Sequence, residues 1–275
     1  MHRDFVASAY DLAVGTVRYE RTGASAVLTI ARPERRNAVD AATAVALREG
    51  FERFEADDEA RALVLTGEGP EAFCAGADLK AFAEAAAEGV DAEAWLDQFP
   101  DGPLGFTRLS ASKPTIAAIS GWCLAGGLEL ALWCDLRIAT ESAKLGCTER
   151  RFGVPLIDGG TQRLPRIVGM GRGLEMILTG RIVEAAEALD WGLVNELVPA
   201  DEHLDRALAI AEGLAAFPQR TMLSDRRAAI EGIGMTFADG LANEAELGVD
   251  SLVTGAEGAK RFTAGEGRGG AGAGV

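Results

Sequence analysis

The feature that most constrains the fold of this chain is the alternation of short aliphatic runs with helical segments along its first 200 residues. Four runs have the length and apolar composition of buried strands. They lie at residues 27–30, 62–66, 115–119 and 136–139. Strands that alternate with helices form right-handed βαβ units around a largely parallel, buried sheet. The pattern therefore predicts an α/β fold.

Helical segments separate these runs. Asp40 is suited to the N-cap of a helix, because its carboxylate can accept a backbone hydrogen bond from the first turn. Apolar residues then recur at helical spacing, at Val45, Leu47, Phe51 and Phe54. Further helices are predicted over 79–88, from about residue 93, and over 124–134.

The last third of the chain is helical in its periodicity throughout. Helices are predicted over 201–217, 219–231 and 237–253. We therefore expect an α/β core over 1–200, a helical C-terminal region over 201–262 and a flexible glycine-rich tail over 263–275.

Charge and hydropathy narrow the range of partners. The chain of 275 residues has a net charge of −15, which repels phosphate backbones and anionic lipid surfaces. We therefore expect neither nucleic acid nor a membrane as a partner.

The longest apolar stretch, 121–139, is interrupted by Glu129, Asp135 and Arg137, which a membrane span would not tolerate. The first residues, MHRDFVASAYDLAVG, lack the pattern of a signal peptide, so a cytoplasmic location is expected.

The rare residues exclude several kinds of catalytic site. The histidines are His2 and His203, and neither is well placed for a nucleophile–histidine pair or a metal site. The four cysteines form no CxxC pair and are predicted to be reduced thiols in a reducing compartment: Cys74, Cys123, Cys134 and Cys147. No metal is expected, and any acid–base chemistry must come mainly from carboxylates.

One candidate site lies between a predicted strand and a helix, in Ala75-Gly76-Ala77-Asp78-Leu79. Glycine and alanine allow another group to approach the backbone closely. Free N–H groups at the start of the following helix would attract an oxygen atom. The alternative is a tight strand-to-helix connection with no ligand.

A second candidate site is Ala125-Gly126-Gly127-Leu128-Glu129-Leu130, where two glycines open an apolar helix. Glu129 lies three residues after Gly126, on the face of the exposed N–H groups. A carboxylate on an apolar helix is costly unless it has a partner or a function, although Glu129 could also cap the helix.

Glu149 follows Glu129 by 20 residues, beside Arg150 and Arg151. The alternative role of Glu149 is a surface ion pair. Taken together, two sets of backbone donors could polarise one carbonyl oxygen while two carboxyls move protons. Two carboxyls at close range cannot both ionise easily, so one keeps its proton near neutral pH. This chemistry suits proton transfer next to a carbonyl, through an enolate-like intermediate.

These segments resemble the enoyl-CoA hydratase/isomerase (crotonase) family. The resemblance covers about residues 15–265, with the motifs in the expected order. The segments that carry it are Ala31-Arg32-Pro33, Arg36-Asn37-Ala38, 73–79, 119–131, 134–139, 159–164, 178–181, Ala188 and 192–195.

The resemblance implies a spiral of ββα units with a helical C-terminal region, assembled as trimers or dimers of trimers. It implies that the N–H groups of Ala77 and Gly126 hold a thioester carbonyl, and that Glu129 and Glu149 add water across the 2,3-double bond of a trans-2-enoyl-CoA. Coenzyme A enters as part of the substrate, without a separate cofactor. The implied contacts for the acyl-CoA are Arg35, Ala38, Ala77, Asp78, Leu79, Lys80 and Gly126.

The stretch after Glu149 departs from typical hydratases. Its proline, Pro155, comes early, and Asp158 precedes the glycine pair. Asp158 resembles, with an offset of one residue, the third acid of dienoyl-CoA isomerases, or it caps a helix that begins near Gly160. Two alternatives therefore stay open: a double-bond isomerase that uses Glu149 or Asp158, and a non-catalytic acyl-CoA-binding homologue. Lys80 and Arg151 are either ligand contacts or solvated charges.

Overall fold

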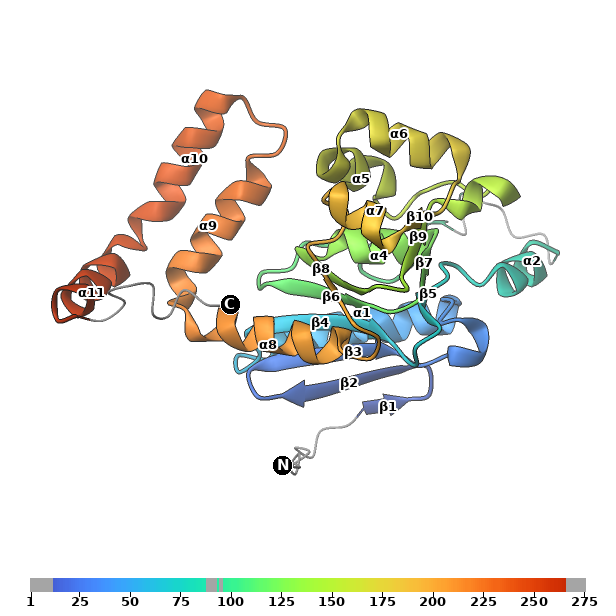
Figure 1. The fold of residues 1–275 in the computed structure, drawn as a ribbon, viewed down its shortest axis with the longest axis horizontal. Coiled ribbons are helices and arrows are strands. Elements are labelled where there is room, and N and C mark those ends of the chain that lie inside the picture. Colours follow the sequence, from blue (N-terminus) through green and yellow to red (C-terminus); the bar gives the residue numbers. More distant parts are fainter. Residues whose placement is uncertain (1–11, 88–92, 94–95, 266–275) are drawn as a thin grey trace.

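The computed structural model describes residues 12–87, 93 and 96–265 (Figure 1). It is an α/β fold, as predicted, with a helical C-terminal region. The strands are β1 (Leu12–Val14), β2 (Val17–Thr22), β3 (Ser25–Ile30), β4 (Ala62–Gly67), β5 (Ala72–Cys74), β6 (Thr115–Ile119), β7 (Trp122–Leu124), β8 (Leu136–Thr140), β9 (Lys144–Gly146), β10 (Val183–Glu184) and β11 (Glu196–Val198).

The α-helices are α1 (Ala41–Ala56), α2 (Leu79–Ala87), α4 (Gly126–Trp133), α5 (Gly160–Val168), α6 (Met170–Thr179), α7 (Ala185–Asp190), α8 (His203–Ala216), α9 (Gln219–Glu231), α10 (Phe237–Val249) and α11 (Leu252–Thr263). Two 3-10 helices, η1 (Pro33–Arg35) and η2 (Thr148–Phe152), interrupt the loops. Most of the helix predicted from about residue 93, and the predicted tail from residue 266 on, lie outside the described residues.

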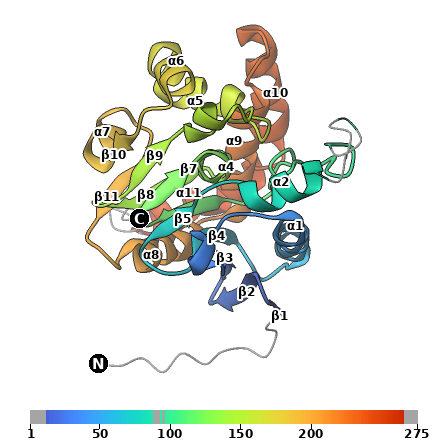
Figure 2. The same cartoon turned by 90° about the vertical axis from the view of Figure 1, so that its right-hand side faces the viewer.

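The larger sheet has seven strands in the order β1-β2-β3-β4-β6-β8-β11. Its four central strands, β3, β4, β6 and β8, are the four predicted runs, and they pair in parallel. Alternate residues of a strand face opposite sides of a sheet, and both faces are covered here. Leu63 and Leu65 of β4 enter one core, whereas Val64 enters a second core beneath α8. Helices α1 and α8 therefore lie on opposite sides of β3 and β4 (Figure 2).

A smaller sheet, in the order β10-β9-β7-β5, packs beside α4. Its strands are two or three residues long and lack a clear aliphatic run, which is why the sequence did not predict them. β5 and β7 run parallel and bring the chain segments after Cys74 and Leu124 to the same edge. The segments that contain Ala77 and Gly126, the two predicted backbone donors, therefore follow the ends of neighbouring strands.

Local signals explain where two helices begin. α1 starts after Asp40, whose Oδ1 accepts hydrogen bonds from the backbone N of Thr43 (2.9 Å) and from its hydroxyl (2.7 Å), so the predicted N-cap is confirmed. α4 starts at Gly126 instead of residue 124, because Leu124 still belongs to β7 and Ala125 has a positive φ of 52°.

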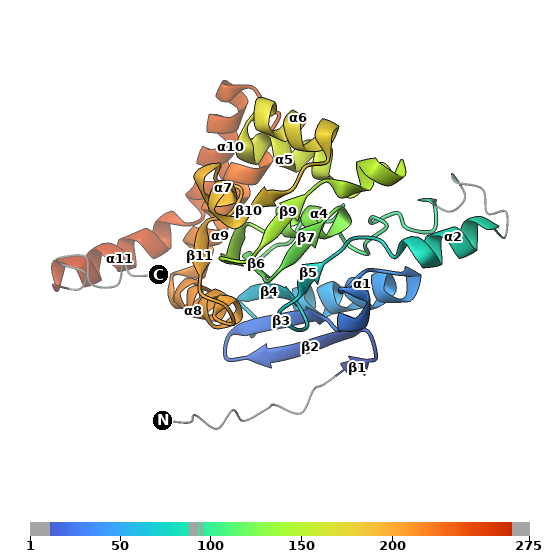
Figure 3. The same ribbon diagram turned by 45° about the vertical axis from the view of Figure 1, so that its right-hand side comes forward.

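The C-terminal helices extend away from the sheets (Figures 1 and 3). α9 and α10 pack against each other, and none of α9, α10 and α11 contains a buried residue within the bounds given. The single helix predicted over 237–253 is divided between α10 and α11. The break lies at residues 250–251, where the Ser251 backbone N donates to Gly248 O and its hydroxyl donates to Arg220 O in α9.

Among the residues that the structure describes, none of the helices is both long enough and apolar enough to cross a membrane.

Candidate active site

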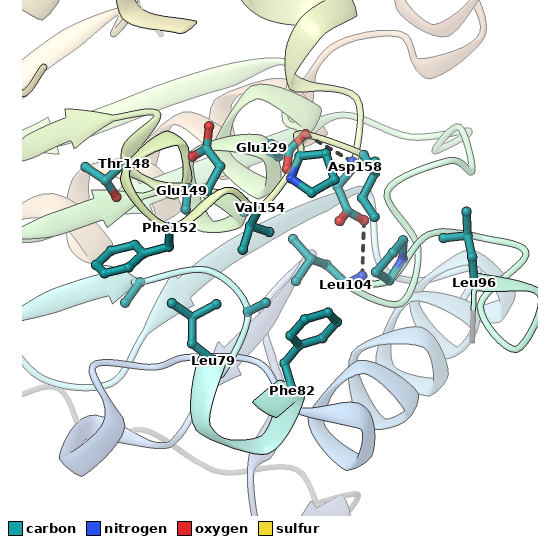
Figure 4. A pocket seen from close by; sticks show the side chains of 17 residues that line it. Leu79, Phe82, Leu96, Leu104, Glu129, Thr148, Glu149, Phe152, Val154 and Asp158 are labelled. Carbon is teal, nitrogen blue, oxygen red and sulfur yellow. Dashed lines mark hydrogen bonds between the residues drawn. The ribbon is translucent and has the colours of Figure 1, made fainter. Parts of the chain in front are cut away.

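One pocket brings together the predicted donors Ala77 and Gly126 and the acids Glu129, Glu149 and Asp158 (Figure 4). Its volume is about 480 Å³, and its wall is mostly apolar, with acidic groups on one side. The residues that line it are Ala75, Ala77, Leu79, Phe82, Leu96, Pro103, Leu104, Ala125, Gly126, Glu129, Thr148, Glu149, Phe152, Val154, Pro155, Ile157 and Asp158.

The Ala77 segment is held by a parallel bridge to Val39. The backbone N of Val39 donates to Gly76 O (2.8 Å), and the backbone N of Asp78 donates to Val39 O (2.8 Å). In a parallel bridge of this kind the residue in the middle turns its own N–H away from the partner chain. The Ala77 N–H therefore faces away from Val39, on the side where Ala77 lines the pocket.

The Gly126 N–H lies close to the same turn. A Cβ atom built on Gly76 would stand 2.8 Å from the backbone N of Gly126, and φ of Gly76 is +91°, so only glycine fits there. Gly126 is the first residue of α4, where backbone N–H groups have no acceptor within the helix and the helix dipole favours negative charge. The two predicted donors thus border one cavity.

Ala125, which precedes α4, has φ 52° and ψ −127°. Side chains with a Cβ atom rarely adopt this backbone conformation, which costs on the order of 1–3 kcal/mol. Its backbone N donates to Gly146 O (2.8 Å), which holds the strained turn against β9. The strain lies at the turn that presents Gly126 to the cavity.

Glu129 is 3 % exposed, and its Oε1 accepts hydrogen bonds from the backbone N of Asp158 (3.0 Å) and Gly160 (2.7 Å). The alternative that Glu129 caps α4 is therefore wrong, because its carboxyl is bound by a different loop. Burial raises the pKa of Glu129 to about 8, and the nearby charges of Asp158 and Glu149 act in the same direction. The two backbone donors oppose this shift only in part.

Glu149, in η2, is also buried. Neither of its carboxyl oxygens has a hydrogen-bond partner among the described residues. The alternative of a surface ion pair is wrong, since Arg150 donates to Ile177 O and Arg151 to Gly180 O. Burial raises the pKa of Glu149. A buried carboxyl without a partner on a pocket wall requires an explanation, and a ligand or water in that pocket supplies one.

Asp158 is the third acid on the pocket wall. It does not cap α5, as one alternative predicted, because α5 begins after Gly159 without a side-chain cap. The Asp158 Oδ1 accepts hydrogen bonds from the backbone N of Leu104 (3.1 Å) and from the Thr107 hydroxyl. Burial raises the pKa of Asp158, and these two donors oppose the shift.

The candidate acyl-CoA contacts divide into two groups. Ala77, Leu79 and Gly126 line the pocket. The others lie outside its wall: Ala38 is buried, Arg35 and Lys80 are exposed, and Asp78 pairs with Arg32 (3.2 Å) and accepts a hydrogen bond from the backbone N of Lys80 (3.2 Å).

Sequence reasoning missed most of the apolar wall. Phe82, Leu96, Pro103, Leu104 and Phe152 come from α2, the loop before β6, and η2. No local pattern in the sequence identified which side chains would face the cavity. Within the described part of the chain, no cluster of three or more His, Cys, Asp or Glu residues could hold a metal ion.

Comparison with known proteins places the chain in a family. A sequence model of the family described as "Enoyl-CoA hydratase/isomerase" matches residues 20–248. The chain is 39 % identical over 238 residues to a probable enoyl-CoA hydratase of Rhizobium meliloti, covering 84 % of this chain and 88 % of that protein. It is 40 % identical over 195 residues to a carnitinyl-CoA dehydratase of Salmonella paratyphi A, covering 70 % and 72 %.

Solved structures agree. The crystal structure of enoyl-CoA hydratase EchA1 from Mycobacterium marinum superposes with a TM-score of 0.82 at 34 % identity, covering 90 % of this chain and 95 % of that one. The chain belongs to the enoyl-CoA hydratase/isomerase family, and the predicted resemblance is confirmed.

Proposed function

We propose that this protein is an enoyl-CoA hydratase that adds water across the 2,3-double bond of a trans-2-enoyl-CoA thioester. The observation that carries the proposal is the buried, unpartnered carboxyl of Glu149 in the pocket that Glu129, Ala77 and Gly126 also line. Relatives named as hydratases at similar identity support it.

The proposed chemistry follows from the positions of these groups. The thioester oxygen accepts hydrogen bonds from the N–H groups of Ala77 and Gly126, which stabilise the negative charge of an enolate. The oxygen of a water molecule bonds to C3 as one glutamate takes a proton from that water. The electron pair of the double bond moves toward the carbonyl, and the other glutamate gives a proton to C2. At the end of the reaction the first glutamate is protonated and the second is ionised.

The reaction requires that one carboxyl holds a proton while the other is ionised. The raised pKa values of Glu129 and Glu149 are consistent with this requirement. Two buried carboxyls on one wall meet this condition, because ionisation of one disfavours ionisation of the other. The pair therefore needs no histidine to supply an acid and a base near neutral pH.

The test is turnover of crotonyl-CoA, followed as loss of the absorbance of its conjugated double bond. Glu129→Gln and Glu149→Gln should each reduce kcat by at least about 10²-fold while leaving the fold intact. Thr66→Val, which removes a buried hydroxyl that donates to Ala118 O in the sheet, is the control. Full activity in either glutamine variant would contradict the proposal, and binding of acyl-CoA without turnover by the wild type would favour a non-catalytic homologue.

A double-bond isomerase is the second candidate, and Asp158 on the pocket wall is the observation that favours it. A 3-enoyl-CoA substrate separates the two reactions. Conversion to the 2-enoyl isomer without formation of a 3-hydroxyacyl product would identify an isomerase.

We also propose that the protein assembles as a homotrimer or a dimer of trimers. The helices α9, α10 and α11 contain no fully buried residue, and Phe237 (84 %) and Leu252 (71 %) are exposed. Exposed apolar faces of this kind are usually covered in an assembly. Sedimentation analysis should give three or six chains, and Phe237→Glu should weaken the association. A monomer at micromolar concentration would contradict this.

We further propose a cytoplasmic location. Cys74, Cys123, Cys134 and Cys147 are all buried and unpaired in the structure, which suits a reducing compartment. Fractionation of the native host, with an antibody to the protein, would test it.

A further inference from the structure

The hydrogen bonds of Asp158 connect its loop to α4, to α5 and to the segment 101–109. Its backbone N donates to Glu129 Oε1 (3.0 Å), and its backbone O accepts from Arg163 Nη1 (2.9 Å). Its Oδ1 accepts from the backbone N of Leu104 and from the Thr107 hydroxyl. Arg163 reaches the same loop from α5, because its Nη2 donates to Thr107 O (2.6 Å).

The segment 101–109 is in turn fixed to the helix that carries Glu129. Phe106 is fully buried between Phe51, at 5.4 Å between ring centroids, and Trp133, at 4.6 Å. The Trp133 Nε1 donates to Leu109 O (2.8 Å), and Trp133 lies four residues after Glu129 in α4. The contacts therefore close a ring from α4 through segment 101–109 and Asp158 back to Glu129.

Gly102 lies where the segment 101–109 packs closely against Asp158. Its φ is +109°, and a Cβ atom built on it would stand 3.0 Å from Asp158 Oδ1. Asp158 and Thr107 are themselves 4 % and 1 % exposed. The two hydrogen bonds accepted by Oδ1, together with this close packing, hold the Asp158 carboxyl in one orientation.

We infer that Asp158 is a positioning residue, which anchors to Leu104 and Thr107 and thereby holds the loop whose N–H groups fix the Glu129 carboxyl. The inference rests on the proposed hydratase function and assigns Asp158 no direct proton transfer. It also accounts for the pocket wall, because Pro103 and Leu104 belong to the anchored segment.

The charge of Asp158 has a separate effect. The titratable groups that face Glu129 are Asp158, Glu149, Arg163 and Cys147. The negative charges of Asp158 and Glu149 raise the pKa of Glu129, whereas the positive charge of Arg163 opposes them. Burial keeps the Cys147 thiol neutral. Removing the charge of Asp158 should therefore lower the pKa of Glu129.

Two variants separate the charge from the anchor. Asp158→Asn keeps an oxygen that can accept from Leu104 and Thr107 but removes the charge. Thr107→Val removes one anchoring hydrogen bond but keeps the charge. Thr66→Val is the matched control, because it removes a buried, hydrogen-bonded hydroxyl that does not line the pocket.

The first measurement needs no turnover. The titration of Glu129 is followed by NMR of protein labelled with ¹³C at the glutamate carboxyls, with Glu129→Gln to assign its signal. In Asp158→Asn the Glu129 titration should move down by about one pH unit, whereas Thr107→Val and Thr66→Val should leave it in place. An unmoved titration in Asp158→Asn would overturn the effect of the charge.

The second measurement is steady-state hydration of crotonyl-CoA. Asp158→Asn should keep kcat within about tenfold of the wild type, and Thr107→Val should lower kcat about tenfold with KM within about twofold. Loss of more than about 10³-fold in folded Asp158→Asn would show a proton carrier and overturn the inference. If the wild type fails to hydrate crotonyl-CoA while the NMR shift occurs, the proposed function fails and the effect of the Asp158 charge on Glu129 still holds.

Discussion

The backbone of Gly160 occupies the space immediately beside the Glu129 carboxyl. Its N–H donates to Glu129 Oε1 at 2.7 Å, and a Cβ atom built on Gly160 would lie 2.9 Å from that same oxygen. A donor and a methyl group cannot both fit at this position. Glycine is therefore required at residue 160 for the hydrogen bond that orients Glu129.

Gly160→Ala should displace the Glu129 carboxyl and reduce kcat by about 10²-fold, because a shift near 1 Å at the reacting centre has effects of this size. Gly171→Ala is the matched control, since Gly171 also lies in the first turn of a helix and has open space around it. The control should keep full activity. Equal activity of both variants in the crotonyl-CoA assay would show that the Glu129 position is not critical.

The pH dependence of the reaction follows from the raised pKa values. Glu129 holds its proton up to about pH 8, so kcat/KM should fall as the pH rises through that value and both carboxyls become ionised. As the pH falls, Glu149 becomes protonated at a pH above the ordinary range for glutamate, and the base is lost. A profile of kcat/KM between about pH 5 and pH 10 tests this. A flat profile across pH 8 would contradict the raised pKa of Glu129.

The same shift makes Glu129 a cost to stability. A carboxyl whose pKa is higher in the folded than in the unfolded state stabilises the fold fully only below its pKa in the unfolded state. This stabilisation is lost as the pH rises toward its pKa in the folded state. Glu129→Gln keeps an oxygen for the Asp158 and Gly160 donors and cannot ionise. At pH 7 it should raise the free energy of unfolding by up to about 3 kcal/mol, with little change near pH 4. Urea titrations at both pH values provide the measurement, and a stability difference that does not vary with pH would contradict it.

Short-range sequence patterns were sufficient for much of the fold and for the candidate residues. The strands β3, β4, β6 and β8 are continuous aliphatic runs because both faces of each strand are buried. Glu129 stood out because a carboxylate on an apolar helix is unusual, and the spacing from Gly126 placed both groups at the helix start. Ala77, Gly126, Glu129 and Glu149 do border one cavity, and their catalytic roles stay predictions.

Interactions between distant segments could not be predicted in this way. The alternative role of Glu149 was an ion pair with its neighbours, but Arg150 and Arg151 bind carbonyls about 30 residues further along the chain. The helix cap predicted as one role of Asp158 was a local contact, whereas its observed partner Thr107 is 51 residues away. Such contacts depend on how loops pack in three dimensions, and the residues involved leave no periodic signal.

Ala125 provides a test of strain at the candidate oxyanion site. Its φ of 52° disfavours a side chain with a Cβ atom, and glycine removes that penalty. Ala125→Gly should therefore stabilise the fold by about 1 kcal/mol, measured as a rise in Tm. Ala131→Gly is the control, because Ala131 lies buried inside α4, the helix that Ala125 precedes, where glycine should destabilise by a similar amount. Destabilisation by both substitutions would show that the turn is not strained.

The four cysteines should be inert while the protein is folded. All are buried, and burial raises the pKa of Cys74 and of Cys147 to about 12, so little reactive thiolate exists at pH 8. An aromatic disulfide reagent should label no thiol in the folded protein and four after denaturation. Ser142→Cys, at an exposed position, should add one rapidly reacting thiol as a positive control. Cys147 interacts with both Glu129 and Glu149, so its labelling would reduce activity. We expect the folded protein to keep its hydration activity after exposure to the reagent. Rapid labelling of Cys147 with loss of activity would show that the pocket opens to solvent beneath η2.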